Sequence, residues 1–373
     1  MNQGAPVTRL VAELPATVPF VGPEAIERQS GRTFILRLGA NESNFGPSPR
    51  AQAAMQAAIG RVSNYADPEN YLLRETLAER LGIKREQIVV GSGIDDLLGL
   101  VVRAFMERGD YAVTSLGAYP TFNYHVAGFG AQLERVPYRN DQNDLEALAE
   151  AAQRVKACLV YLANPDNPTG SWHTATELHA LVERLPNQCL LILDEAYTEF
   201  APPDAIPPIA VEDPRVLRMR TFSKAYGMAG ARIGYAFGPE SLIQVFEKIR
   251  LHFGVNLLAV EGALASLEDD DFVQSVVTSV AAGREDYTHL ARELGLAPLP
   301  SATNFVTIDA GGFERAKHLV TALAAEGVFI RMPGVAPLNR CIRVTVGQPA
   351  ERAAFAEIFR RVLPVVQTTT PAA

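Results

Sequence analysis

Six short apolar segments between residues 86 and 238 alternate with amphipathic stretches, and this alternation is the feature that most restricts the fold. Runs of Val, Ile and Leu separated by helical sequences such as TATELHALVERL (174–185) are typical of strand–helix units around a parallel sheet. The sequence therefore predicts an α/β domain with a mainly parallel sheet between helices. The expected strands are EQIVVGS (86–92), DYAVTS (110–115), ACLVYLA (157–163), CLLILDEA (189–196), VLRMRTF (216–222) and ARIGYAFG (231–238).

The flanking sequence predicts two further regions. Residues 1–48 contain the Pro- and Gly-rich clusters VPFVGPE (18–24) and LGANESNFGPSP (38–49), which indicate an irregular N-terminal arm. After the large domain, expected over residues 49–265, a long helical stretch (269–295) precedes three apolar runs and a last helix. We interpret residues 266–373 as a smaller α+β domain.

The overall charge limits which classes of partner the protein is expected to bind. A formal net charge of -8 and a pI near 5.4 disfavour nucleic acid and anionic membranes, so an anionic ligand would need a local cluster of donors. No apolar run approaches the ~20 residues of a membrane span, and the first residues do not resemble a signal peptide. Cys158, Cys189 and Cys341 lie far apart in apolar runs, which fits neither a metal site nor a disulfide framework. We therefore expect a cytoplasmic protein with buried thiols and no metal.

The first expected strand ends in the segment GSGIDD (91–96), which opens a helix. Small residues at this position allow backbone N–H groups to approach a phosphate, and the helix dipole favours an anion. The segment lacks the third glycine of a dinucleotide fingerprint and the Gly-Lys-Ser/Thr of a nucleoside-triphosphate loop. Alone, it also fits an ordinary strand-to-helix turn.

Two other strand ends carry unusual polar residues. In YLANPDNPTG (161–170), Asn167 can present its amide to a ligand, although the segment also fits a plain turn. In LLILDEAYTEF (190–200), Asp194 ends a strongly apolar strand. A buried carboxylate there costs several kcal/mol, on the order of ~3 or more, unless a cation or strong donor meets it. Asp194 therefore either faces a positive group or caps a helix.

The segment RTFSKAYGMAGARIGY (220–235) surrounds Lys224 with apolar residues. Desolvation keeps such an amine partly neutral, as a Schiff-base nucleophile requires, while a solvated lysine is the ordinary alternative. Ser223 and Arg232 can bind an anion, because a guanidinium fork matches a phosphate. Together, the four strand ends predict a ligand with a phosphate, a carbonyl that condenses with an amine, and a basic ring nitrogen. Pyridoxal 5'-phosphate has all three groups.

The ordered motifs GSGIDD, YPTF, NPDNPTG, DEAY, SKAYGMAGARIGY, ATNF and IRVTVG resemble those of fold-type I pyridoxal-phosphate aminotransferases, in particular the histidinol-phosphate aminotransferase family. The resemblance extends from about residue 38 to residue 347. It implies a seven-stranded, mainly parallel sheet and transfer of an amino group from L-histidinol phosphate to 2-oxoglutarate, a step of histidine biosynthesis.

The resemblance also implies roles for individual residues. Lys224 would form the Schiff base with the cofactor and then act as general base and acid. Asp194 would pair with the pyridinium nitrogen. The other cofactor contacts would be Asn167 and Tyr197 to the ring 3'-oxygen, Phe122 against the ring face, and Gly93, Ile94, Asp95, Ser223 and Arg232 to the phosphate, with Tyr65 reaching the phosphate from the second subunit of a homodimer.

Substrate recognition is implied for Arg331 in FIRMPG and Arg343 in IRVTVG, with Asn167 and Phe20 as further contacts. Two guanidinium groups suit either a phosphate or a carboxylate. The chain departs from the family pattern at Phe20, where these enzymes often have tyrosine, and in KIRLHFGVN (248–256), which leaves the roles of Arg250 and His252 open.

These departures keep other functions open. One is an aminotransferase for aromatic or other amino acids on the same scaffold. Another is a decarboxylase that resembles phosphothreonine decarboxylase. A third, from a different class, is a non-catalytic pyridoxal-phosphate-binding regulator, although the acidic chain has no basic helix-turn-helix region.

Overall fold

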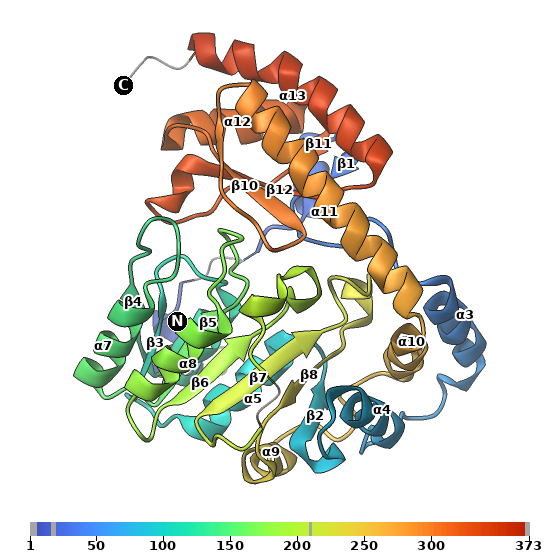
Figure 1. Ribbon diagram of the computed structural model, residues 1–373, viewed down its shortest axis with the longest axis vertical. Coiled ribbons are helices and arrows are strands. Elements are labelled where there is room, and N and C mark those ends of the chain that lie inside the picture. Colours follow the sequence, from blue (N-terminus) through green and yellow to red (C-terminus); the bar gives the residue numbers. More distant parts are fainter. Residues whose placement is uncertain (1–5, 16–19, 209–210, 370–373) are drawn as a thin grey trace.

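The large domain is built on a seven-stranded sheet. The computed structural model describes residues 6–15, 20–208 and 211–369. The strand order is β2-β8-β7-β6-β5-β3-β4, and every neighbouring pair is parallel except the two that involve β8 (Figure 1). The mainly parallel sheet is therefore confirmed. The strands are β2 (Ile88–Gly91), β3 (Tyr111–Ser115), β4 (Gln132–Val136), β5 (Leu159–Ala163), β6 (Leu190–Asp194), β7 (Val216–Thr221) and β8 (Gly234–Phe237).

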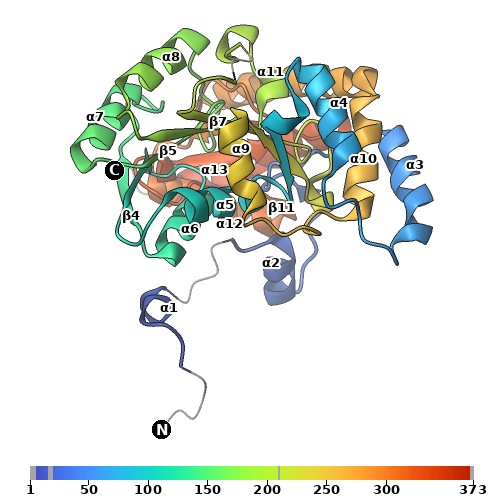
Figure 2. The same cartoon turned by 90° about the horizontal axis from the view of Figure 1, so that it is seen from below.

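The sheet separates two helical layers, because alternate residues of each strand point to opposite faces. In β5, Leu159 and Tyr161 pack on the layer of α5 (Ile94–Phe105), α6 (Thr121–Phe129) and α9 (Glu240–Glu247). Val160 and Leu162 pack on α7 (Leu145–Val155) and α8 (Ala175–Arg184), which lie across the sheet from α5 and α6 (Figure 2). Further along, α4 (Tyr71–Leu81) and α10 (Leu257–Leu267) cover β2 and β8, and α3 (Pro49–Ala58) packs on α10.

The small domain follows in sequence and packs around β10. Its elements are α11 (Asp270–Glu293), β9 (Ala297–Pro298), β10 (Phe305–Asp309), α12 (Phe313–Ala325), β11 (Val328–Phe329), β12 (Cys341–Thr345) and α13 (Pro349–Thr369). Strand β10 pairs antiparallel with both β9 and β12. The expected boundary at residue 266 falls inside α10, which packs on the large domain, so α11 is the first helix of the small-domain core.

The N-terminal arm is more ordered than its composition indicates. It contains α1 (Arg9–Glu13), α2 (Pro23–Ser30) and β1 (Leu36–Arg37). Strand β1 pairs parallel with β11, and Leu36 and Leu38 enter the small-domain core (Figure 1). Residues 36–38 therefore belong structurally with the small domain, because their apolar side chains are buried there.

Short 3₁₀ turns complete the described chain, at Ile59–Arg61, Arg85–Gln87, Thr198–Phe200, Pro203–Ala205, Ala229–Ala231 and Leu338–Arg340. Among the described helices, none is both long enough and apolar enough to cross a membrane.

Candidate active site

A cavity of about 720 Å³ lies beyond the carboxyl ends of the parallel strands. The loops after β3, β5, β6 and β7 supply one wall, as expected for open α/β sheets, and the arm and the small domain supply the other. Among the residues that line the cavity are Phe20, Asn41, Glu42, Asp95, Tyr119, Arg135, Asn167, Asp194, Tyr197, Ser223, Lys224, Arg232, Arg331 and Arg343.

Lys224 lies three residues after β7 and directs its amine into the cavity. Its Nζ donates to the carbonyl oxygen of Asn41 at 2.9 Å and lies 5.7 Å from the Tyr197 ring centroid. Burial, assisted by the positive charge of Arg343, lowers the pKa of Lys224 to about 8. About a tenth of the amine is therefore neutral and nucleophilic at pH 7, and about half at pH 8.

A glycine three residues later fixes the turn that carries this lysine. Gly227 adopts a left-handed φ of 68°, and a Cβ on it would overlap the carbonyl oxygen of Gly46. Only glycine allows the turn to pack this closely on the arm. The glycine punctuation after Lys224 thus reflects close backbone approach.

Asp194 ends β6 on the face of the sheet that carries α5 and α6. Its carboxylate accepts hydrogen bonds from the Tyr161 hydroxyl at 2.7 Å and the Ala196 N–H at 3.0 Å. Burial nevertheless raises the pKa of Asp194 to about 6, so a cation in the cavity would stabilise its ionised form. The adjacent Glu195 pairs with Arg218 at 2.6 Å and does not line the cavity.

The N-terminus of α5 forms an anion cradle with the end of β7. Gly93 precedes the helix with a left-handed φ of 88°, and a Cβ there would lie 2.6 Å from Arg232 Nη2. Arg232 is partly exposed and lies 3.5 Å from the Asp95 carboxylate. The Ser223 hydroxyl accepts from Thr221 at 2.9 Å. Backbone N–H groups, a hydroxyl and a guanidinium thus converge as a phosphate requires.

The opposite end of the cavity carries two adjacent arginines. Arg331 and Arg343 exchange backbone hydrogen bonds, and Arg343 Nη1 donates to Asn167 Oδ1. The Phe20 ring lies 3.9 Å from the Arg331 guanidinium carbon, within cation–π range. The Nε atoms of both arginines are buried without a hydrogen-bond partner among the described residues. Burial lowers the pKa of Arg331 to about 10 and also lowers that of Arg343, so an anion bound here would relieve an electrostatic cost.

Comparisons with known proteins agree with this geometry. Residues 33–359 match the family described as aminotransferase class I and II. The chain belongs to this family. It is 35% identical over 366 residues to histidinol-phosphate aminotransferase 2 of Carboxydothermus hydrogenoformans, covering 96% of this chain and 100% of the relative. A histidinol-phosphate aminotransferase of Geobacillus thermodenitrificans is 33% identical, with 95% and 98% covered.

Solved structures extend the likeness to the fold. The crystal structure of histidinol-phosphate aminotransferase from Sinorhizobium meliloti, in complex with pyridoxal-5'-phosphate, has a TM-score of 0.94 and 49% identity, with 99% of this chain and 100% of that chain covered. An aspartate aminotransferase mutant from Thermus thermophilus shares the fold, with a TM-score of 0.80 and 23% identity, over 96% and 100% of the two chains. The aminotransferase fold expected from the motifs is thereby confirmed.

The structure brings most of the predicted site residues to one cavity. Those that line it are Phe20, Ile94, Asp95, Asn167, Asp194, Tyr197, Ser223, Lys224, Arg232, Arg331 and Arg343, while Gly93 stands immediately behind Ile94. Phe122 is not in it, and Tyr65 is predicted to reach the phosphate of a second subunit rather than this cavity. Tyr65 is 80% exposed and stacks on Phe253, with ring centroids 4.5 Å apart.

The placement of Phe122 corrects the prediction that it stacks on the cofactor ring. Phe122 is fully buried in α6 and packs against Tyr161, with ring centroids 5.1 Å apart. Tyr119 precedes the helix and lines the cavity instead. In the motif YPTF, helix α6 begins at Thr121. Phe122 is the first inward-facing aromatic residue of this helix and enters the core, whereas Tyr119 stays in the preceding loop.

The residues with uncertain roles lie outside the cavity. Arg250 pairs with Glu247, at 2.7 Å, and its side chain is 9% exposed. His252 is exposed, and neither residue lines the cavity.

Sequence reasoning missed several polar groups of the site, among them Asn41, Tyr119, Tyr161 and Arg135. Asn41 donates to the Tyr197 hydroxyl at 3.0 Å, and its carbonyl receives the Lys224 amine. The alternation of side chains in β5 could have placed Tyr161 on the Asp194 face. Arg135 lies in β4, a strand that the apolar pattern did not reveal.

Proposed function

We propose that this protein is a pyridoxal-phosphate-dependent transaminase that transfers the amino group of L-histidinol phosphate to 2-oxoglutarate. The observation that carries the proposal is one cavity in which Lys224, with its lowered pKa, lies between a cradle for one anion and a pair of arginines for another. The family membership and the names of the relatives support the same reaction.

The residues of this cavity fit the cofactor. When bound, pyridoxal phosphate supplies a carbonyl that condenses with amines and a ring that accepts electrons. Its phosphate would be held by the N-terminus of α5, Ser223 and Arg232, and its ring nitrogen by Asp194. The raised pKa of Asp194 is the independent indication, because a buried carboxyl aimed into a cavity is stabilised by a cationic partner. Tyr119 would lie against the ring, and Asn167 and Tyr197 would bind its 3'-oxygen.

Lys224 would hold the proton that moves during transfer. Its amine is neutral in part at physiological pH and lies beside the carbonyl oxygen of Asn41, which orients it. A base of this pKa is matched to proton transfer near pH 7–8. Asp194 would remain hydrogen-bonded to Tyr161 and keep its orientation throughout.

Arg331 and Arg343 would bind the anionic end common to both substrates. A phosphate presents more oxygens than a carboxylate, so two guanidinium groups with unsatisfied N–H donors suit the phosphate of histidinol phosphate especially well. Phe20 would pack over Arg331 and limit its conformations.

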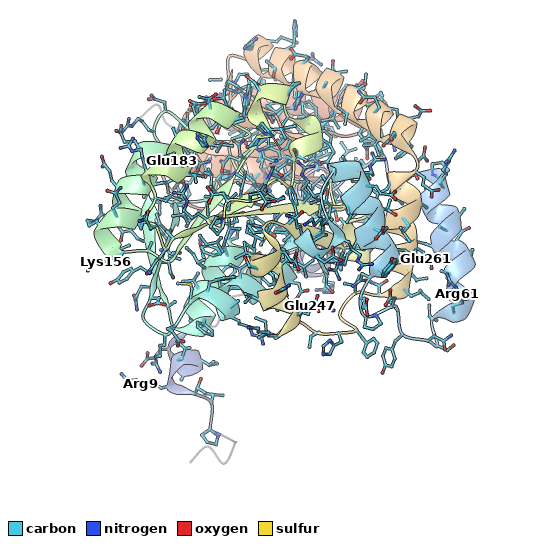
Figure 3. All side chains as sticks on the ribbon, turned by 60° about the horizontal axis from the view of Figure 1, so that its bottom comes forward. Arg9, Arg61, Lys156, Glu183, Glu247 and Glu261 are labelled. Atoms are coloured by element: carbon cyan, nitrogen blue, oxygen red, sulfur yellow. The ribbon has the colours of Figure 1, made fainter. Side chains whose placement is uncertain are left out.

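We further propose that the enzyme acts as a homodimer in the cytoplasm. Tyr65, Leu72, Leu251 and Phe253 are apolar side chains that are each more than half exposed, and Tyr65 stacks on Phe253. The ion pair between Arg61 and Glu261, at 2.6 Å, joins the turn after α3 to α10 (Figure 3). A second copy would cover the exposed apolar side chains and carry Tyr65 to the phosphate cradle of its partner.

A panel of amino donors tests the substrate. Holoenzyme is assayed with 2-oxoglutarate and, separately, histidinol phosphate, phenylalanine, tyrosine and phosphothreonine, with release of carbon dioxide measured in parallel. We expect histidinol phosphate to give the highest kcat/KM. Preference for an aromatic donor would identify an aromatic aminotransferase, carbon dioxide release a decarboxylase, and absence of any donor-dependent spectral change a non-catalytic binding protein.

A further inference from the structure

Arg135 lies on the edge strand of the large sheet and lines the cavity. The other arginines of the described lining, Arg232, Arg331 and Arg343, come from other elements. Arg135 belongs to β4, the outermost strand beside β3 (Figure 1). Leu133 of this strand packs in the α5 and α6 layer, whereas Val136 packs in the α7 and α8 layer. Because side chains alternate, Arg135 leaves the strand on the α6 side. There it lines the cavity together with Asn123 and Tyr124 of α6.

The guanidinium of Arg135 has no hydrogen-bond or ion-pair partner among the described residues. The neighbouring charged residues do have ion-pair partners: Glu134 pairs with Arg154 at 2.7 Å, and Arg139 pairs with Asp144 at 2.7 Å. Arg135 is thus an exposed cation that faces a cavity rather than a carboxylate.

The other charges of the cavity leave Arg135 available. Three carboxylates line the described walls, at Glu42, Asp95 and Asp194. Asp95 lies beside Arg232, and Asp194 is bound by Tyr161. No acidic residue of the lining comes from α6 or β4.

The order of the strands in the sheet separates Arg135 from the pair formed by Arg331 and Arg343. Arg343 contacts Asn167, which follows β5, and β4 lies two strands from β5. This offset is about 10 Å between strand axes. A five-carbon dicarboxylate spans about 5 Å between its carboxyl carbons, and extended arginine side chains reach roughly 6 Å. A diacid held by Arg343 at one end can therefore meet Arg135 at the other.

The two substrates of the proposed reaction differ at this end. Histidinol phosphate carries a neutral imidazole there, whereas 2-oxoglutarate and glutamate carry a second carboxylate. We propose that Arg135 is a specificity-determining residue that binds the distal carboxylate of the dicarboxylic amino acceptor and of its amino-acid product. The inference rests on the proposed function, and it explains how one cavity accepts a phosphate donor and still selects an acidic acceptor.

The matched variants are Arg135→Gln and Arg108→Gln. Arg108 is also exposed, lies before β3 and does not line the cavity, so its removal changes net charge equally. Arg135→Lys keeps the charge and tests partial rescue. The wild type and the three variants are all compared as holoenzyme.

The first readout is binding by calorimetry of glutarate and of pentanoate, which has the same chain length and one carboxylate. We expect Arg135→Gln to weaken glutarate about tenfold, as loss of a charge-assisted hydrogen bond implies. Pentanoate should change by less than about twofold, and Arg108→Gln should change neither. Equal loss for both acids, or no loss for glutarate, would overturn the proposal.

The second readout is turnover, with each KM measured while the other substrate is saturating. Arg135→Gln should raise KM for 2-oxoglutarate about tenfold and leave KM for 2-oxopentanoate and histidinol phosphate within about twofold. A parallel rise in KM for histidinol phosphate would contradict a role confined to the acceptor. If histidinol phosphate proves not to be the donor, the glutarate and pentanoate comparison still decides the role of Arg135, so the two failures are separable.

Discussion

The two ends of the active-site cavity are built on different principles. At the cofactor end, the polar groups already have partners: Asp194 is bound by Tyr161, Ser223 by Thr221, and Arg232 lies beside Asp95. At the substrate end, Arg331 and Arg343 have buried Nε atoms without partners in the described chain, and Arg135 has no ion pair.

The difference follows from what each end must bind. A resident cofactor needs one geometry, so its contacts come from strand ends of a single rigid sheet and are held by neighbours. In the proposed reaction two chemically different substrates would alternate at the other end, where donors without permanent partners come from an arm, a second domain and an edge strand. We expect changes at the cofactor end to abolish the chemistry and changes at the substrate end to alter selectivity.

The largest effect is expected for Lys224→Ala. Loss of the amine should lower kcat by roughly 10³-fold or more, because no other group within the described cavity can replace a nucleophilic base of this pKa. Turnover is measured with histidinol phosphate and 2-oxoglutarate, and circular dichroism checks the fold. Lys248→Ala, an exposed lysine outside the cavity, is the control. Substantial activity in Lys224→Ala would contradict its assignment.

Arg343→Gln should produce the next largest effect. Removing a buried guanidinium that contacts Asn167 should lower kcat/KM for both substrates by about 10²-fold, equivalent to roughly 2.7 kcal/mol. Cofactor affinity, measured by equilibrium titration of the apoprotein, should change by less than about threefold. If the cofactor affinity of Arg343→Gln falls by the same factor as its kcat/KM, the cofactor end and the substrate end are not independent.

Tyr65→Ala tests whether the cofactor end is completed by a second subunit. We expect pyridoxal phosphate to bind about tenfold more weakly, since one phosphate contact is lost. Tyr111→Ala, another exposed tyrosine at the far end of β3, is the control. Sedimentation velocity reports the oligomeric state. A monomer with undiminished cofactor affinity would rule out the intersubunit contact.

The pH dependence of pyridoxal-phosphate binding to the apoprotein should show whether Arg343 at the substrate end affects Lys224 at the cofactor end. The neutral amine of Lys224 is the reactive form, so the rate of recombination with apoprotein should rise from pH 7 to pH 9 by about tenfold around a pKa of about 8. Arg343 helps to lower this pKa. Arg343→Gln should therefore move the profile to higher pH. An unchanged midpoint in stopped-flow absorbance would show that burial alone sets the pKa.

The smallest effect is expected at Phe20. Phe20→Ala removes the cation–π contact with Arg331, which is worth about 0.5–1 kcal/mol at an exposed position. KM for histidinol phosphate should rise about threefold, and Phe20→Tyr should keep the wild-type value or lower it. A rise of tenfold or more in Phe20→Ala would mean that the arm organises the arginine pair as a whole.

The sequence by itself determined which polar residues stand at the strand ends that line the cavity. Asn167, Asp194 and Lys224 each follow a strongly apolar strand, and the carboxyl ends of parallel strands meet at one edge of the sheet. Local pattern and spacing were sufficient because these side chains are placed by the strand that precedes them. The sequence also shows a glycine at position 227, but its close contact with the carbonyl oxygen of Gly46 in the arm is visible only in the structure.

Only the tertiary structure placed the residues that come from the edge strand, the start of α6 and the arm. Strand β4, with the sequence QLERV, is an edge strand whose exposed polar residues weaken the apolar pattern, so Arg135 could not be placed from the sequence. The choice between Tyr119 and Phe122 depended on where α6 begins. Phe20 and Arg331 meet although 310 residues separate them. These contacts join segments distant in the chain, and their geometry is set by packing between domains rather than by local sequence.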